Sequence, residues 1–269
     1  MKNNFDFAIL GGDRRMAILA KMLENVGNCK HFLNSDGDMP ERIEATATIL
    51  PIPCSFDGIR LSCFAGAPLL NDVISHIYSP FVFGGRIPAE IRKELTARGM
   101  RVYDLLEDEA LLIKNAQLTA EGALGIIIAE TQRAVLGARI TVIGFGRIGR
   151  ALARILTALG ARVTVAARSI AQLAEAECLG CLTVPLTELP TAIAGADAVC
   201  NTAPAHVLGR AELAAFSAGV PFIELASGGF NASSEVRFIN AQGLPGKTAP
   251  ESAAQIIYDR ITDLLLRQI

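Results

Sequence analysis

Short apolar runs alternate with amphipathic stretches along the whole chain, a pattern that predicts parallel β-sheets with connecting helices. The first run, Phe5–Leu10, is predicted to be a strand, and the glycines after it turn the chain into a helix that ends at Gly27. Further strands are predicted at 46–50, 81–83 and 101–103, and a helix near 89–98. Together these elements predict a small open α/β domain.

A second α/β domain is predicted after a long apolar stretch. Residues 115–137 are expected to form a helix that links the two domains, with Thr119 as its N-cap. Strands are predicted at 138–143, 162–166, 198–200 and 221–225. Residues 252–266 are typical of an amphipathic helix that returns to the first domain. The expected division is 1–114 plus 247–269 for the N-terminal domain, 115–137 for the linking helix and 138–246 for the second domain.

The second domain contains a complete GxGxxG motif between a predicted strand and a predicted helix, which is the context of a dinucleotide-binding turn. Gly144 permits the tight turn, Gly146 lets the backbone approach a pyrophosphate, and Gly149 lets the helix pack on the strand. The start of the helix, at Arg147 and Ile148, points amides and partial positive charge at the phosphates. The motif predicts a Rossmann domain.

The end of the next strand bears on the choice between NAD and NADP. NAD sites place an acidic residue there to bind the ribose hydroxyls, whereas this strand ends in Arg168 and Ser169. A guanidinium group suits a 2′-phosphate, and the serine adds a hydroxyl donor. NADP is therefore the predicted cofactor. The alternative is that Arg168 is a solvated surface residue and that the site accepts NAD loosely.

Two later loops follow predicted strands and are expected at the same edge of the sheet. They contribute Thr202, Ala203 and Pro204, and then Ala226 and Ser227, as candidate cofactor-binding residues. An ordinary turn and packing between loops are the alternatives.

The first domain offers candidates for substrate binding. Its glycine turn lacks GxGxxG and is interpreted as an anion site rather than a second cofactor site. Asp13, Arg14 and Arg15 follow this turn, Arg86 follows another strand, and Lys247 precedes the last helix. The cations among them can bind substrate carboxylates. The alternative is that they are ordinary surface residues.

No Ser-His-Asp or paired-carboxylate arrangement is recognisable. Asn115, Thr119 and Glu121 lie at the expected domain junction, where they can orient a substrate. A buried Glu121 could accept a proton. The alternative is a carboxylate in the first turn of a helix, where it merely suits the helix dipole.

Composition narrows the function classes. The chain has 269 residues with 25 Lys and Arg against 27 Asp and Glu, and this balance argues against a dedicated nucleic-acid binder. Apolar runs are short, so no membrane span is expected. Six scattered cysteines, with one CxxC and no nearby histidine, give no metal site.

Taken together, these motifs resemble the A subunits of dipicolinate synthase from spore-forming bacteria. The generic part is the Rossmann motif. The specific parts are the opening GGDRR at 11–15 and the closing PGKTAP at 245–250, and the resemblance spans nearly the whole chain.

The resemblance implies two open parallel-sheet domains as in 2-hydroxyacid dehydrogenases, the second a Rossmann NADP-binding domain. It implies NADP-dependent oxidation of dihydrodipicolinate, formed from 4-hydroxy-tetrahydrodipicolinate, to dipicolinate during sporulation. It also implies a small dicarboxylate substrate, a location in the mother-cell cytoplasm and a flavoprotein-like B subunit as partner. We also expect a homo-oligomer. The alternatives are another NADP-linked oxidoreductase of a small carboxylated substrate and a non-catalytic regulatory subunit that binds NADP(H).

Overall fold

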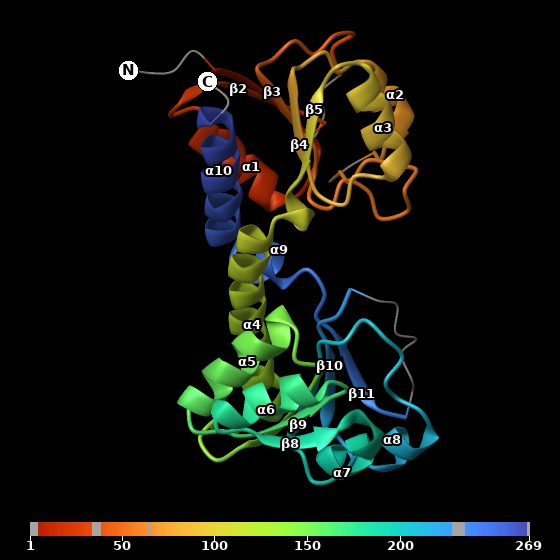
Figure 1. Ribbon diagram of the computed structural model, residues 1–269, viewed down its shortest axis with the longest axis vertical. Helices are drawn as coiled ribbons and strands as arrows, with labels where there is room; N and C mark the ends of the chain where they lie inside the picture. Colours follow the sequence, from red (N-terminus) through yellow and green to blue (C-terminus); the bar gives the residue numbers. More distant parts are fainter. Residues whose placement is uncertain (1–4, 34–38, 64–65, 228–234, 268–269) are drawn as a thin grey trace. The chain divides into compact units, whose positions relative to one another are not determined.

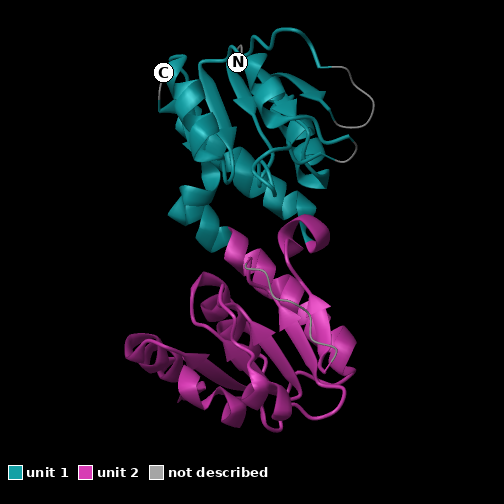
Figure 2. Ribbon diagram, turned by 90° about the vertical axis from the view of Figure 1, so that its right-hand side faces the viewer, with its two compact units in different colours: residues 1–114, 249–269 teal, residues 115–248 magenta. Residues whose placement is uncertain are grey.

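The chain divides into two compact units, which Figure 2 shows in different colours. The computed structural model describes residues 5–33, 39–63, 66–227 and 235–267. Unit 1 consists of Met1–Lys114 and Ala249–Ile269, and unit 2 of Asn115–Thr248. The chain therefore passes from unit 1 to unit 2 and back again.

Unit 1 contains an all-parallel sheet of five strands in the order β2-β1-β3-β4-β5 (Figure 1). The strands are β1 (Phe5–Leu10), β2 (Gly27–Phe32), β3 (Ala47–Ile49), β4 (Phe81–Gly84) and β5 (Arg101–Asp104). The helices are α1 (Arg14–Leu23), α2 (Leu70–Ser75), α3 (Ala89–Ala97), the 3-10 helix η1 (Leu105–Glu107) and α10 (Pro250–Leu266). The strand order reverses between β1 and β3, which makes this a topological switch point.

Alternate residues of β1 pack on opposite faces of this sheet. Phe7 and Ile9 are buried with the apolar faces of α1 and α10. Ala8 and Leu10 are buried with α2 and α3 on the other side. Burial on both faces is typical of parallel strands, because their connecting helices cover both sides.

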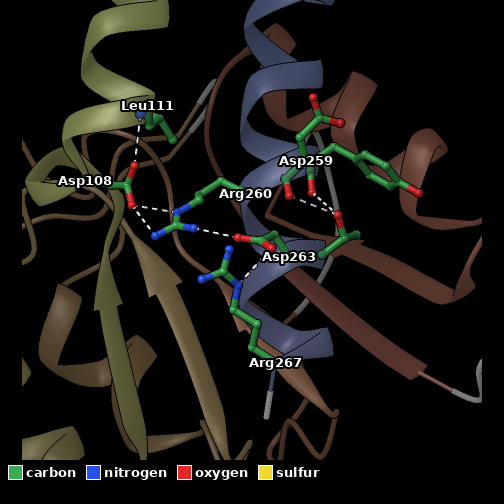
Figure 3. Close-up of polar contacts among 8 residues, drawn as sticks. Asp108, Leu111, Asp259, Arg260, Asp263 and Arg267 are labelled. Carbon is green, nitrogen blue, oxygen red and sulfur yellow. Dashed lines mark hydrogen bonds and ion pairs between the residues drawn. The ribbon is translucent and has the colours of Figure 1, made fainter. Parts of the chain in front are cut away.

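Helix α10 is tied to the start of α4 (Glu109–Thr131) by charged hydrogen bonds (Figure 3). Arg260 donates from Nε to Asp108 Oδ2 at 2.6 Å and from Nη1 to Asp263 Oδ2 at 2.7 Å. The other oxygen of Asp108 accepts from the amide of Leu111 at 2.9 Å, so Asp108 caps α4. Only 15% of the Asp108 side chain and 28% of Arg260 are exposed, so solvent screens this pair less than a surface ion pair.

The structure corrects the expected bounds of the long helix. α4 covers Glu109–Thr131 rather than 115–137, because Asp108 caps it earlier and Gln132 ends it in a left-handed conformation with φ of 51°. Thr119 is not an N-cap. It lies inside α4, where its hydroxyl donates to the carbonyl oxygen four residues earlier at 2.9 Å.

Most of α4 is a core element of unit 2. Ala120, Ala123 and Ile127 are buried there, although in the described part of the chain α4 is also the one helix long and apolar enough in composition to cross a membrane. Gly122 allows close packing of α9 (Leu244–Thr248), because a Cβ on it would lie 2.8 Å from Thr248 Oγ1. Unit 2 ends at Thr248, two residues later than the expected end of the second domain at residue 246.

Unit 2 contains an all-parallel sheet of six strands in the order β11-β10-β9-β6-β7-β8. The strands are β6 (Arg139–Ile143), β7 (Arg162–Ala167), β8 (Leu182–Pro185), β9 (Ala198–Asn201), β10 (Pro221–Glu224) and β11 (Arg237–Asn240). The helices are α5 (Arg147–Ala158), α6 (Ile170–Cys178), η2 (Leu186–Glu188), α7 (Leu189–Ile193), α8 (Arg210–Ala214) and α9 (Leu244–Thr248). The strand order reverses between β6 and β9, so the carboxyl ends of these strands form the expected ligand crevice.

The prediction of two open parallel-sheet α/β domains is confirmed. In unit 2, Ile140 and Val142 are buried with α4 and α5 on one face. On the other face, Ile143 and Val199 are buried with the apolar residues of α7. Both sheets are thus covered on both sides and leave the ends of their strands for binding.

Candidate functional site

A cavity of about 320 Å³ lies at the carboxyl ends of β6, β7 and β9 in unit 2. It is lined by the glycine turn after β6, by the end of β7 and by the loop after β9. The lining residues are Gly144, Phe145, Gly146, Ala166, Ala167, Arg168, Gln172, Leu186, Thr202, Ala203, Pro204, Ala205 and Val207. The cavity therefore occupies the topological switch point of the sheet.

The three motif glycines are present for different reasons. Gly144 has a φ of +86°, a left-handed conformation that favours glycine. There is no space for a side chain at Gly149, because a Cβ on it would lie 2.3 Å from the carbonyl oxygen of Gly144. A Cβ on Gly146 would have no atom within 4 Å. Packing within the protein explains Gly144 and Gly149 but not Gly146, whose missing side chain leaves space for a ligand.

The start of α5 fits an anionic group beside this space. Gly146 is the N-cap of α5 and supplies no side-chain cap to the first turn, which begins at Arg147 and Ile148. The helix has twelve residues, so its N-terminus carries the partial positive charge of a helix dipole. The helix dipole at the start of α5 and the open space above Gly146 fit the pyrophosphate of a dinucleotide.

Arg168 lies at the carboxyl end of β7 and lines the cavity together with Gln172. Its side chain is exposed. No aspartate or glutamate is among the residues that line the cavity, all of which lie in described ranges. Ser169 is the N-cap of α6 and is exposed next to Arg168. The wall at this end of the cavity is therefore cationic rather than acidic.

The loop after β9 forms the opposite wall. Thr202 donates from Oγ1 to the carbonyl oxygens of Ile143 and Gly144 at 2.9 and 3.2 Å, which fixes the loop against the glycine turn. Ala203 and Pro204 also line the cavity. The structure thus brings these predicted residues together with the GxGxxG turn.

The two predicted residues after β10 lie away from the cavity wall. Ala226 is buried, and its carbonyl oxygen accepts from Gln242 Nε2 at 2.7 Å. Ser227 is exposed. Neither residue lines the cavity.

Glu224 was not among the predicted site residues, and it is buried at the end of β10 with 1% of its surface exposed. Its carboxylate accepts from Asn201 Nδ2 at 3.1 and 2.9 Å and from the amide of Ala226 at 2.9 Å. Burial raises the pKa of Glu224, and the hydrogen bonds from Asn201 and Ala226 partly oppose this effect. The signal in the sequence was an acidic residue directly after an apolar run.

In unit 1, Asp13 and Arg15 bind each other. Asp13 caps α1 by accepting from the amide of Arg15 at 2.9 Å, and the Arg15 guanidinium pairs with the same carboxylate at 2.7 Å and donates to the carbonyl oxygen of Ile52. The charge of Arg15 is therefore compensated, and a carboxylate already occupies the N-terminus of α1. This geometry favours a structural role for Arg15 and argues against an anion site there.

Arg14 and Arg86 are the exposed cations near the ends of β1 and β4 in unit 1. Arg86 has a φ of +52°, an uncommon and strained conformation for a residue with a side chain. The turn is held because the amides of Arg86 and Ile87 donate to the Asp104 carboxylate at 3.0 and 2.8 Å. Within the described ranges, no three His, Cys, Asp or Glu side chains gather as metal ligands would.

The remaining candidates lie near the points where the chain changes units. Asn115 begins unit 2, and Lys247 is exposed near its end. Thr119 is buried, and its hydroxyl is bound within its own helix. The expectation of a buried Glu121 is wrong, because this side chain is exposed and accepts from Gln117 at 3.1 Å.

Comparison with known families agrees with this geometry. The family model for the NAD-binding domain of D-isomer specific 2-hydroxyacid dehydrogenases matches residues 116–237. The matched range contains the glycine turn, Arg168 and the loop after β9. Unit 2 is therefore a domain for a nicotinamide dinucleotide.

Individual proteins are similar over more of the chain than the family model covers. The A subunit of dipicolinate synthase from Bacillus subtilis is 30% identical over 190 residues, which cover 68% of this chain and 64% of that protein. The crystal structure of the A subunit of dipicolinate synthase from Bacillus halodurans has a TM-score of 0.84 at 25% identity and covers 98% of this chain and 99% of that chain. D-lactate dehydrogenase from Escherichia coli has a TM-score of 0.64 at 16% identity, covers 98% of this chain and 96% of that chain, and shares the fold.

The fold and the site define a dehydrogenase-like protein, with a nicotinamide dinucleotide domain and two parallel sheets of the kind found in 2-hydroxyacid dehydrogenases. The matches with the A subunits of dipicolinate synthase confirm the resemblance that the sequence indicated. The sequence match spans just under two thirds of the length of the Bacillus subtilis protein.

Proposed function

We propose that this chain is the A subunit of a dipicolinate synthase and takes part in the NADP⁺-dependent oxidation of dihydrodipicolinate to dipicolinate. Its substrate would arise by loss of water from 4-hydroxy-tetrahydrodipicolinate. In the oxidation, one C–H bond of the ring breaks with transfer of a hydride to the nicotinamide, and a proton leaves another ring position. NADP⁺ supplies the hydride acceptor when bound, and formation of the aromatic ring makes the step favourable without a strong base from the protein.

The cofactor assignment depends on one observation, the composition of the cavity wall. Arg168 lines the cavity, and no carboxylate is among the lining residues. Gly146 leaves space for the pyrophosphate, and the start of α5 provides a partial positive charge. A guanidinium at the end of the second strand suits a 2′-phosphate, which an acidic residue there would repel. These features support NADP(H) over NAD(H).

For the substrate, we assign the two carboxylates to exposed cations. Arg14 and Arg86 lie near the ends of β1 and β4 in unit 1 and are exposed, unlike Arg15, which is paired with Asp13. Lys247 is the third candidate. Guanidinium groups bind carboxylates through two parallel hydrogen bonds, which would also orient the ring.

The similar proteins are named as one subunit of an enzyme, which supports the existence of a partner, and we propose a flavoprotein-like B subunit in that role. The mother-cell cytoplasm during sporulation and a homo-oligomeric state belong to the same proposal. Sporulation and its compartment follow from the resemblance to the A subunits.

Replacing Arg168 tests the cofactor assignment. Arg168→Ala should raise the dissociation constant of NADPH ten- to a hundredfold, because a charged bidentate contact contributes roughly 1.5–3 kcal/mol, and that of NADH much less. The matched control is Arg162→Ala, at the exposed start of the same strand β7, which should leave both constants unchanged. An equal loss for both cofactors on replacing Arg168 would refute the 2′-phosphate assignment.

Turnover tests the reaction itself. The chain, alone and with the B subunit, would be mixed with NADP⁺ and 4-hydroxy-tetrahydrodipicolinate, and NADPH and dipicolinate followed by absorbance. Formation of both products in equal amounts supports the proposal. Turnover only of other cyclic imines or of 2-hydroxy acids would identify a different oxidoreductase. NADPH binding without turnover in either sample would identify a regulatory role for this chain.

A further inference from the structure

A buried pair of polar residues connects two neighbouring strands directly behind the cavity wall. Asn201 ends β9 and Glu224 ends β10, and the two are register partners in the sheet. Each has 1% of its surface exposed. Polar side chains are costly to bury unless they are fully hydrogen-bonded, so the arrangement of donors and acceptors here determines what each position tolerates.

The backbone fixes the orientation of the Asn201 amide. Its Oδ1 accepts from the amide nitrogen of Ala203 at 3.0 Å, and a backbone N–H can only donate. Its Nδ2 must therefore point the other way, where it donates to Glu224 Oε1 and Oε2 at 3.1 and 2.9 Å and to the Ala203 carbonyl oxygen at 3.1 Å. The amide of Ala226 donates to Glu224 Oε1 at 2.9 Å. Every one of these contacts to Glu224 is thus made by a donor.

We propose that Glu224 is a positioning residue of the dinucleotide site, which holds the Asn201 side chain in place and through it the cavity-lining loop 202–204. Both backbone polar groups of Ala203 bind the Asn201 side chain, and Ala203 lines the cavity. The neighbouring Thr202 contacts the glycine turn through its hydroxyl. A change at Glu224 would therefore shift the wall against which the dinucleotide binds. This inference rests on the proposed function, since it assumes that unit 2 binds NADP(H).

The hydrogen-bond pattern predicts that glutamine cannot replace Glu224, although the two residues have the same shape. With its oxygen at the Oε1 position, the glutamine side chain of the Glu224→Gln variant would place an NH₂ group against Asn201 Nδ2. Turning the Asn201 amide over would relieve this contact but would place Nδ2 against the amide of Ala203. Each arrangement leaves two donors facing each other in a buried place, so the loop must move.

Reversing donor and acceptor should restore part of the pair. In the double variant Glu224→Gln with Asn201→Asp, the new NH₂ group at position 224 donates to a carboxylate at position 201. The amides of Ala203 and Ala226 keep their acceptors, but the carboxylate oxygen that replaces Nδ2 now faces the Ala203 carbonyl oxygen and the oxygen of the new glutamine. Asn201→Asp alone would place two carboxylates side by side and should be damaging. A double-mutant cycle therefore measures the coupling between the two residues directly.

The experiment is titration of the full chain with NADPH, followed by nicotinamide fluorescence, together with thermal unfolding. Glu224→Gln should raise the dissociation constant at least tenfold, and the double variant should bind NADPH at least threefold more tightly than Glu224→Gln. The control is Asp197→Asn. Asp197 lies just before β9, at the amino end of the strand that Asn201 ends, and its carboxylate accepts from the amide of Arg139 at 2.8 Å. This variant should leave NADPH binding unchanged.

The outcomes separate the two proposals. Failure of the unmodified chain to bind NADPH refutes the proposed function. Normal binding by the unmodified chain and by Glu224→Gln, with or without a lower melting temperature, refutes the positioning role and leaves a merely structural one. Equal losses for Glu224→Gln and the double variant also refute it, because no coupling through Asn201 would then exist. Loss in each single variant with recovery in the double variant supports it.

Discussion

Replacing Gly146 and Gly149 separately by alanine should distinguish binding from packing in the glycine turn. A Cβ on Gly146 meets open space, and the backbone there has an ordinary extended conformation with φ of −79°. Alanine is a weaker N-cap than glycine but restricts the unfolded chain, and these effects largely cancel. We therefore expect the free energy of unfolding to change by less than about 0.5 kcal/mol. The added methyl group would occupy the space of the pyrophosphate, so NADPH binding should weaken at least tenfold.

Gly149→Ala should behave in the opposite way. Its Cβ would lie 2.3 Å from the Gly144 carbonyl oxygen and 3.0 Å from Thr202 Oγ1, so α5 must move away from the turn. Overpacking of this kind costs about 1–3 kcal/mol, of which the better helix propensity of alanine returns less than about 1 kcal/mol. Urea unfolding and NADPH titration of both variants measure the two effects. Normal NADPH affinity in Gly146→Ala would show that the reasoning about this turn is wrong, as would equal destabilisation of the two variants.

Two further predictions concern unit 1. Burial lowers the pKa of His31, with a partly opposing contact between Nε2 and the Gly11 carbonyl oxygen at 2.7 Å, so the folded state favours the neutral ring. The stabilisation that the neutral ring gives to the folded state is present above the ordinary pKa of 6.5 and is lost as the pH falls through the lowered pKa. As the pH falls through this range, the free energy of unfolding of His31→Gln should therefore decrease less than that of the unmodified chain. Arg260→Ala removes the partner of Asp108 and should destabilise the chain by about 1–2 kcal/mol in urea unfolding. Arg267→Ala, at an exposed pair, should cost less than about 0.5 kcal/mol, and equal costs would contradict the importance of burial.

The sequence predicted the central strands, because they are continuous apolar runs that are buried on both faces, and it also predicted one edge strand, β5. It missed β2, β8 and β11, which lie at sheet edges and have no fully buried residue. Edge strands have weak apolar patterns because one side is open to solvent, and β2 was hidden further by Gly27, which resembled a helix end but begins the strand. The start of α4 was missed because its cap, Asp108, precedes an apolar stretch interrupted by polar residues.

The candidate cofactor residues could be predicted because their chemistry is encoded locally. Glycine spacing and the residue at the end of the second strand lie in short segments that a sequence displays directly. The pair of Asn201 and Glu224 could not be predicted, since its members are 23 positions apart and meet only through the register of β9 and β10. The Arg15 pairing depends on side-chain geometry that the sequence does not show, although Asp13 is only two residues away.

The two glycine turns of the chain show how a single residue changes the use of a strand end. A Cβ on Gly12 would lie 2.2 Å from Met16 Cγ, so packing within unit 1 explains this glycine, and Asp13 places a carboxylate at the start of α1. In unit 2, Gly146 takes the N-cap position, leaves open space and places no carboxylate at the start of α5. Anions are stabilised at the second helix start and repelled by the carboxylate at the first. The same strand–turn–helix unit therefore suits a dinucleotide in unit 2, which is why the proposed function assigns the substrate carboxylates to exposed arginines and not to the start of α1.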